Sequence, residues 1–148
     1  MFDSSPFYDV NATRALEMAL SKSTTIQYLK SVGIKHLGEM FVMWRNKKSI
    51  HELSEDKNIP NHNKKAKLEK IEFFKRKILE NSFTDTTLFG MRKNKDSPIV
   101  IIDGIHRAIG IYKAYLNDKQ IEKKVCLRIL LCDGENIAEL DDYKLSSA

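Results

Sequence analysis

An apolar run that changes directly into a helical pattern is the clearest feature of the sequence. Residues 99–102 read Ile-Val-Ile-Ile after a proline, which predicts a short strand buried on both faces. The pair Asp103-Gly104 interrupts this run, and apolar residues then recur at helical spacing. Their stripe comprises Ile105, Ile109, Tyr112 and Leu116. The pattern therefore predicts a strand that turns at Gly104 straight into a helix.

The segments around this junction carry simpler patterns. Two neighbouring apolar rows among lysines predict a helix over 64–81. β-favouring residues over 84–92 predict a strand that pairs with 99–102 as a hairpin. Apolar residues on both faces of 125–132 predict a central or well-covered strand, and the tail beyond residue 136 is expected to hold a short helix.

The first third of the chain is expected to be mostly helical. Asn11 is a candidate N-cap for a helix over 12–21, and Ser23-Thr24-Thr25 for a second helix that ends at Gly33. Residues 34–45 fit either a strand or a helix, and their aromatic and methionine content favours a helix.

The domain organisation follows from these elements. Residues 49–53 are a short strand candidate, followed by a polar loop that contains Pro60. We expect an α+β domain over 49–148 with a small mixed sheet and packed helices. A helical N-terminal extension over 1–48 would complete one compact domain.

Composition narrows the class of protein. The 148 residues are 42% apolar and 30% charged, as in an ordinary globular domain. No apolar run approaches the roughly 20 residues that span a bilayer, and no secretory signal is visible, so no membrane partner is expected. Cys126 and Cys132 lie too far apart on one strand for a disulfide, which favours a reducing, cytoplasmic location.

The chain is mildly basic, with a formal net charge of +5. This balance is compatible with nucleotide or nucleic-acid partners and requires neither. Much of the positive charge lies in the cluster of lysines over 64–77. Glutamates alternate with these lysines, so a solvated amphipathic face is the plainer interpretation, and a nucleic-acid surface is the alternative.

The junction after residue 102 is a candidate anion site. The first backbone N–H groups of a helix lack partners within it, and the helix dipole is positive there, which suits phosphate. His106 and Arg107 are potential cations in this first turn, where the dipole disfavours them, so an anionic ligand would explain their position. The alternative is that Asp103 is a plain N-cap and both cations are solvated.

The stretch Ile-Ile-Asp-Gly-Ile-His-Arg-Ala over 101–108, between a strand and a helix, resembles the Asp-Gly-x-His-Arg motif of the ParB/sulfiredoxin superfold. The superfold includes sulfiredoxins, the CTP-binding domains of ParB partition proteins and free-serine kinases. The resemblance covers roughly residues 49–133 and is supported by the order of predicted elements. It implies the small mixed sheet of that superfold and a nucleotide-binding function.

Differences from these relatives narrow the expected chemistry. Sulfiredoxins carry a cysteine immediately before the His-Arg pair, where this chain has Ile105, so thiol chemistry is not expected. ParB domains have a Glu-Arg-Arg version of the turn and a downstream DNA-reading domain, for which Ala148 comes too early. Free-serine kinases, with Asp-Gly-His-His-Arg, are the most similar in motif.

The resemblance and the chemistry of the side chains together assign roles at the turn. Gly104, Ile105, His106 and Arg107 would hold a phosphate of ATP or ADP, or of CTP. Asp103 would bind Mg²⁺ or polarise the attacking hydroxyl of a small hydroxyl-containing substrate. His106 would donate to the transferred group or protonate a leaving oxygen.

The catalytic base is where the sequence departs from the kinase pattern. Those kinases place a glutamate just before the helix that precedes the motif, and this chain has Ile-Pro-Asn-His-Asn over 59–63. His62 is the nearest residue able to take a proton, and Glu52 lies upstream with Glu55. His62 and Glu52 are therefore the candidates for the catalytic base. The alternatives are that His62 is a loop histidine without a role in the reaction and that Glu52 is a surface carboxylate.

Three functions are compatible with these features. The first is a nucleotide-dependent phosphotransferase, kinase-like toward a small hydroxyl compound, or a nucleotide hydrolase. The second is a ParB-like DNA-associated nucleotide-binding or nuclease protein that uses the basic residues 64–77. The third is a catalytically silent regulatory domain. The oligomeric state and the role of residues 1–48 stay open.

Overall fold

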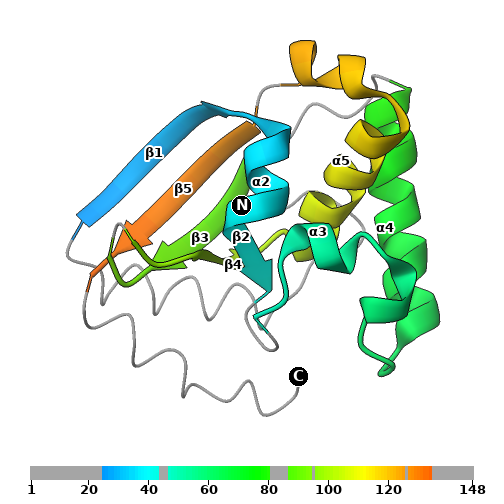
Figure 1. Ribbon diagram of the computed structural model, residues 1–148, viewed down its shortest axis with the longest axis horizontal. Coiled ribbons are helices and arrows are strands. Elements are labelled where there is room, and N and C mark those ends of the chain that lie inside the picture. The colour runs from blue at the N-terminus through cyan, green and yellow to red at the C-terminus, as the bar shows by residue number, and fades with distance from the viewer. Residues whose placement is uncertain (1–24, 44–46, 81–86, 95, 126, 135–148) are drawn as a thin grey trace.

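A five-stranded sheet and a layer of helices make up the described part of the protein. The computed structural model describes residues 25–43, 47–80, 87–94, 96–125 and 127–134 (Figure 1). The strands are β1 (Thr25–Val32), β2 (Phe41–Met43), β3 (Thr87–Arg92), β4 (Ile99–Asp103) and β5 (Leu127–Asp133). The α-helices are α2 (Ile34–Met40), α3 (Ile50–Leu53), α4 (Lys64–Leu79) and α5 (Ile105–Asn117), with short 3₁₀ helices η1 (Asp56–Asn58) and η2 (Lys119–Lys123).

The sheet is mixed, with the strand order β1-β5-β3-β4-β2. Two neighbouring pairs run parallel, β2 with β4 and β3 with β5. The other two pairs, β1 with β5 and β3 with β4, are antiparallel. The helices α3, α4 and α5 lie together on one side of the sheet in Figure 1, with α4 outermost. The α+β class with a small mixed sheet and packed helices is therefore confirmed.

Several elements form where the hydrophobic pattern predicts them. The helix expected over 64–81 is α4, and the hairpin expected from 84–92 and 99–102 is the antiparallel pair β3 and β4. The expected central strand is β5, which lies between β1 and β3. In β4, Ile99, Val100 and Ile101 are buried, as a strand covered on both faces requires.

The N-terminal prediction is partly wrong: residues 34–40 form the expected helix, α2, but the residues on either side of it do not. Residues 25–32 form β1, not a second helix, and residues 41–43 form β2 after the helix α2. Both strands belong to the same sheet as β3, β4 and β5, so this region is not a helical extension. The helix expected over 12–21, the tail helix and Cys126 lie outside the described residues.

The short strand expected over 49–53 is also wrong. Ser49 forms an isolated bridge with Val42, and the chain then turns into α3. Ser49 is the N-cap: its side chain accepts a hydrogen bond from the backbone N–H of Glu52, and the Glu52 carboxylate accepts one from the backbone N–H of Ser49. This capping box satisfies two helix-end donors and fixes the start of α3.

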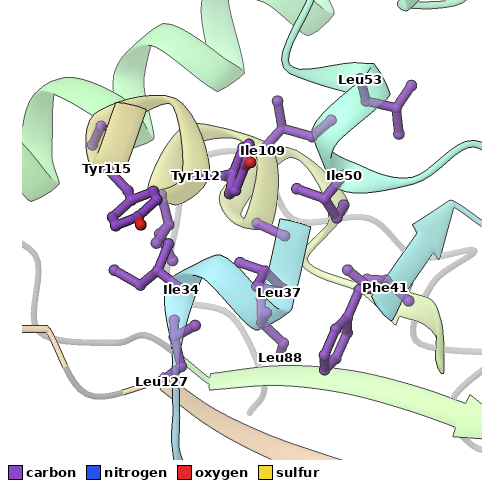
Figure 2. Close-up of a cluster of buried hydrophobic side chains, with 14 of the residues drawn as sticks. Ile34, Leu37, Phe41, Ile50, Leu53, Leu88, Ile109, Tyr112, Tyr115 and Leu127 are labelled. Atoms are coloured by element: carbon purple, nitrogen blue, oxygen red, sulfur yellow. The ribbon is translucent and has the colours of Figure 1, made fainter. Parts of the chain in front are cut away.

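The hydrophobic core is centred on α5. Figure 2 shows Ile34 and Leu37 of α2 packed between α5 and the strands β3 and β5, with Ile50 of α3 close by. On α5, most positions from Arg107 to Tyr115 are buried, whereas Leu116 at its end is 44% exposed instead of lying on the buried stripe. On β5, Leu127, Ile129 and Leu131 face this core.

The contact between α4 and α5 is unusually close at one position. A Cβ atom on Gly110 would lie 2.7 Å from Cβ of Phe74, 2.8 Å from the carbonyl oxygen of Ile71 and 2.9 Å from the backbone nitrogen of Lys75. Only a residue without a side chain allows this approach, so Gly110 permits the close spacing of α4 and α5 at this point.

Candidate functional site

The turn between β4 and α5 is built around Gly104. Its backbone has φ 94° and ψ 21°, in the left-handed region that residues with a side chain rarely adopt. A Cβ atom at this position would also lie 2.8 Å from Cδ2 of Leu88 on β3. Conformation and space therefore both require glycine where the strand enters the helix.

Gly104, and not Asp103, is the N-cap of α5. The carbonyl oxygen of Gly104 accepts the first helical hydrogen bond, from the backbone N–H of Ala108 at 2.8 Å, and glycine has no side chain with which to cap the helix. The first turn of the helix contains no acidic residue. Asp103 therefore does not occupy the N-cap position that the plain N-cap alternative gave it.

Arg107 is a buried cation beside this turn. It is 2% exposed, so the alternative in which it is solvated is wrong. Its Cζ atom lies 5.6 Å from the centroid of the Phe74 ring on α4, and its Nη1 atom lies 3.7 Å from the point that a Cβ on Gly104 would occupy. The guanidinium thus lies between α4 and the turn, with its charge at the start of α5.

The other residues of the motif differ in exposure. Asp103 is 7% exposed at the end of β4 and is the acidic residue closest to Arg107 in the sequence. His106 is partly exposed. The Ile105 side chain packs against the core, so Ile105 would contact a ligand through its backbone N–H. A ligand at this turn would therefore meet backbone N–H groups and His106 first, with Asp103 and Arg107 beneath them.

Glu52 is used in the capping box of α3. Its Oε1 atom lies 3.1 Å from the backbone nitrogen of Ser49 and 3.2 Å from the Ser49 hydroxyl, and the residue is exposed. Within the described ranges, no hydrogen bond or ion pair joins Glu52 to residues 103–107. The geometry gives this carboxylate a structural role at the start of a helix.

His62 lies in the exposed loop before α4. Its Nε2 atom is 3.2 Å from Nδ2 of Asn63, the residue in the N-cap position of α4. Among the described residues it makes no hydrogen bond or ion pair to the β4–α5 turn. The structure therefore places Asp103, Gly104, Ile105, His106 and Arg107 in one continuous turn, and among the described residues it shows no hydrogen bond or ion pair from this turn to His62 or Glu52.

A histidine–tyrosine pair is a feature that the sequence analysis missed. Nδ1 of His51 on α3 lies 2.7 Å from the hydroxyl oxygen of Tyr112 on α5, and the two rings meet edge to face. Burial, with the neighbouring Tyr115 and Glu39, raises the pKa of the Tyr112 hydroxyl above 10.0. Tyr112 therefore stays neutral and orients His51, whose ring is exposed. The hydrophobic spacing predicts that Tyr112 is a core residue, but it does not predict the hydrogen bond between Tyr112 and His51.

Comparison with known proteins adds no relative: no protein-family model, no curated protein and no solved structure matches the chain. Among the residues that the structure describes, no group of three or more His, Cys, Asp or Glu side chains is arranged to hold a metal ion. In the same part of the chain, no helix combines the length and the apolar character needed to cross a membrane.

Proposed function

We propose that the protein is a nucleotide-binding phosphotransferase that holds a phosphate of ATP or ADP at the β4–α5 turn and acts on a small hydroxyl-containing substrate. The observation that carries the proposal is the position of the Arg107 guanidinium beside Gly104, at the positive end of α5. The positive charge of the buried guanidinium and the positive end of the α5 dipole therefore lie close together. Phosphate is the ligand that such a point favours.

The residues of the turn fit a phosphate group in three ways. Gly104 supplies the left-handed backbone that turns β4 directly into the N-terminus of α5. The backbone N–H groups of the first turn of α5 point out of the helix end and can donate to phosphate oxygens. His106, which is partly exposed, can donate a further hydrogen bond or a proton to a leaving oxygen.

Asp103 would hold Mg²⁺ in this proposal. Mg²⁺ in phosphoryl-transfer sites is commonly bound by one or two carboxylates and by substrate phosphates, which suits a single carboxylate at the end of a strand. When bound, the ion would neutralise charge on the phosphate oxygens. Asp103 itself would also orient the hydroxyl of the acceptor toward the phosphate.

The order of elements around the turn supports the ParB/sulfiredoxin superfold as the proposed fold. A helix, a strand, a second strand that ends in Asp-Gly, a helix and a further strand follow one another from α4 to β5. This part of the order agrees with the order that the resemblance requires, whereas the strand that it requires before α4 is replaced by the helix α3.

Thermal unfolding with a panel of nucleotides tests the proposal. A ligand that binds only the folded state stabilises it by about 2.7 kcal/mol at one hundred times its Kd. We expect ATP or ADP with Mg²⁺ to raise the melting temperature of the full chain by about 5–10 °C at that excess. CTP is the comparison that separates the kinase-like members of the superfold from the ParB-like ones.

Two variants identify the site. His106→Ala is the milder variant, because the side chain is partly exposed, and it should fold normally and lose most of the nucleotide-induced shift. Arg107→Ala should abolish the shift and also lower stability without ligand, because the side chain is buried against Phe74. If no nucleotide stabilises the wild-type chain, the proposal is wrong and a catalytically silent domain is the better description.

A further inference from the structure

Two lysines lie on the loop that enters α3. Lys47 and Lys48 directly precede Ser49, the N-cap of this helix. Ser49 forms a bridge with Val42 of β2, and Val42 pairs on its other side with Val100 of β4. Ser49, β2 and β4 therefore lie side by side, which places the backbone beside Ser49 about 10 Å from that of β4, or two strand spacings.

The lysines lie at the same end of the sheet as the β4–α5 turn. Strands β2 and β4 are parallel, with Met43 at the end of β2 paired with Ile101, and Asp103 ends β4 two residues later. Because the bridge between Ser49 and Val42 is antiparallel, the residues before Ser49 extend beyond this same end. In Figure 1 the segment that leads into α3 starts beside the tip of the β2 arrow.

The backbone that carries the two lysines has a defined conformation. Lys47 has φ 55°, in the left-handed region. Among the described residues other than glycine, only Asn63 shares a positive φ, and asparagine adopts this conformation more readily than lysine does. Immediately after the lysines, the capping box of Ser49 and Glu52 fixes the direction of the chain. Lys47 is exposed and Lys48 is partly exposed, so both belong to the surface at this end of the sheet.

The charge of the β4–α5 turn is small for a chain of phosphates. In the part of the chain that the structure describes, Arg107 and Asp103 are the buried charged residues, and their formal charges cancel. The positive end of the α5 dipole adds about half an elementary charge. Mg²⁺ would neutralise part of the charge of the phosphates, and those that extend away from the turn need further cations. Lysine is a common ligand for such phosphates.

We infer that Lys47 and Lys48 bind the phosphates next to the one held at the turn, so that the site selects a nucleoside di- or triphosphate over a monophosphate. Ligands of open sheets with helices usually bind outside the carboxyl ends of the parallel strands, and both the lysines and the turn lie at that end of β2 and β4. The inference rests on the proposed function and adds a ligand class and two binding residues to it.

Isothermal titration calorimetry of the full chain, with Mg²⁺ present, tests the inference. Wild type should bind ATP and ADP at least about tenfold more tightly than AMP. The double variant Lys47→Ala, Lys48→Ala should bind ATP, ADP and inorganic tripolyphosphate at least about tenfold more weakly, and AMP within about twofold of wild type. Loss of tripolyphosphate binding shows that the lysines contact the phosphates and not the nucleoside.

Two controls separate charge at this loop from other causes. Lys47→Gly retains a residue that adopts the left-handed backbone and removes the ammonium group, so it should weaken ATP binding as Lys47→Ala does. Lys93 lies in the β3–β4 loop, at the other end of β4, and Lys124 caps η2. Both are exposed, and the double variant Lys93→Ala, Lys124→Ala should bind ATP within about twofold of wild type.

The outcomes distinguish this inference from the proposed function. Equal ATP affinity in wild type and Lys47→Ala, Lys48→Ala, with binding lost in His106→Ala, would overturn the inference and leave the proposed function intact. Equal weakening by the two double variants would show attraction to net charge alone and would also overturn it. An unchanged ATP affinity in Lys47→Gly would reduce the role of Lys47 to loop conformation. If no nucleotide binds wild type, both proposals are wrong.

Discussion

The hydroxyl oxygen of Tyr112 lies 2.7 Å from Nδ1 of His51, and this hydrogen bond joins α5 to α3. The Tyr112 ring also fills the space above Gly38 of α2, where a Cβ atom would overlap the ring. Tyr112 therefore connects three helices. Its hydroxyl is the polar end of a side chain that is otherwise part of the core.

The first prediction concerns the stability of the protein at high pH. Because burial raises the pKa of Tyr112 above 10.0, the folded protein holds the phenolic proton more tightly than the unfolded chain. This contribution to stability is complete below pH 10 and is lost as pH rises through the raised pKa. Urea unfolding between about pH 8 and pH 11 should show the free energy of unfolding falling more steeply in wild type than in Tyr112→Phe.

The same variant has a defined effect near neutral pH. Tyr112→Phe keeps the ring against Gly38 and removes one hydrogen bond, which should lower the free energy of unfolding by about 0.5–1.5 kcal/mol. Identical pH slopes for wild type and Tyr112→Phe would contradict the assignment of the alkaline loss to this residue.

The second prediction concerns the turn at Gly104. Gly104→Ala must adopt a left-handed backbone and place its Cβ 2.8 Å from the Leu88 side chain. We expect a loss of about 1–3 kcal/mol in the free energy of unfolding, measured by denaturant titration. Gly33→Ala is the control, because Gly33 has a negative φ and its Cβ would meet only the end of the Glu122 side chain. A comparable loss in both variants would contradict the special role of the turn.

The third prediction concerns the contact between α4 and α5. Alanine favours a helix over glycine by about 1 kcal/mol, yet Gly110→Ala should destabilise the protein by about 1–3 kcal/mol. The reason is that its Cβ would meet backbone atoms of Ile71 and Lys75 below 3.0 Å, and backbone cannot move aside as a side chain can. Leu116→Ala, at an exposed position of the same helix, should change stability by less than about 0.5 kcal/mol.

The fourth prediction tests Asp103 in the proposed reaction. Asp103→Asn removes the charge that would hold Mg²⁺ and should lower turnover by about 100-fold or more, while nucleotide binding by backbone N–H groups changes less. Asp96→Asn, at an exposed position of the β3–β4 loop, is the control. Turnover in Asp103→Asn equal to that of wild type would remove Asp103 from the mechanism.

The fifth prediction separates two roles of Glu52. Glutamine supports a capping box as glutamate does, so Glu52→Gln should keep both stability and turnover close to those of wild type. Ser49→Ala loses the cap and should lower the free energy of unfolding by about 0.5–2 kcal/mol. A large loss of turnover in Glu52→Gln with unchanged stability would instead make this carboxylate part of the reaction.

The elements that the sequence predicts well are those with one dominant local pattern. Helix α4 has its apolar rows, β4 has four consecutive β-branched residues, and α5 starts where the strand pattern stops at Gly104. The same local pattern brings residues 103–107 together, because strand, turn and helix are continuous in the chain. A site made from one continuous segment needs no knowledge of the tertiary fold.

The elements that the sequence predicts poorly depend on distant partners. Residues 25–32 fit a helix by spacing, but they pair with β5 at the other end of the described chain, and that pairing makes them a strand. The positions of His62 and Glu52 relative to the turn likewise depend on how separate elements pack. Residues 49–53 are different, since the Ser-x-x-Glu pattern of a capping box is visible in the sequence and would have predicted α3.

The strand order also determines when the protein can complete its folding during synthesis. Strand β5 is made last of the described strands, yet it occupies the place between β1 and β3. Until β5 leaves the ribosome, β1 lacks its hydrogen-bonding neighbour in the sheet, and its backbone is open to pairing with other chains. Completion of the sheet therefore requires pairing between distant parts of the chain, which is the kind of contact that slows folding.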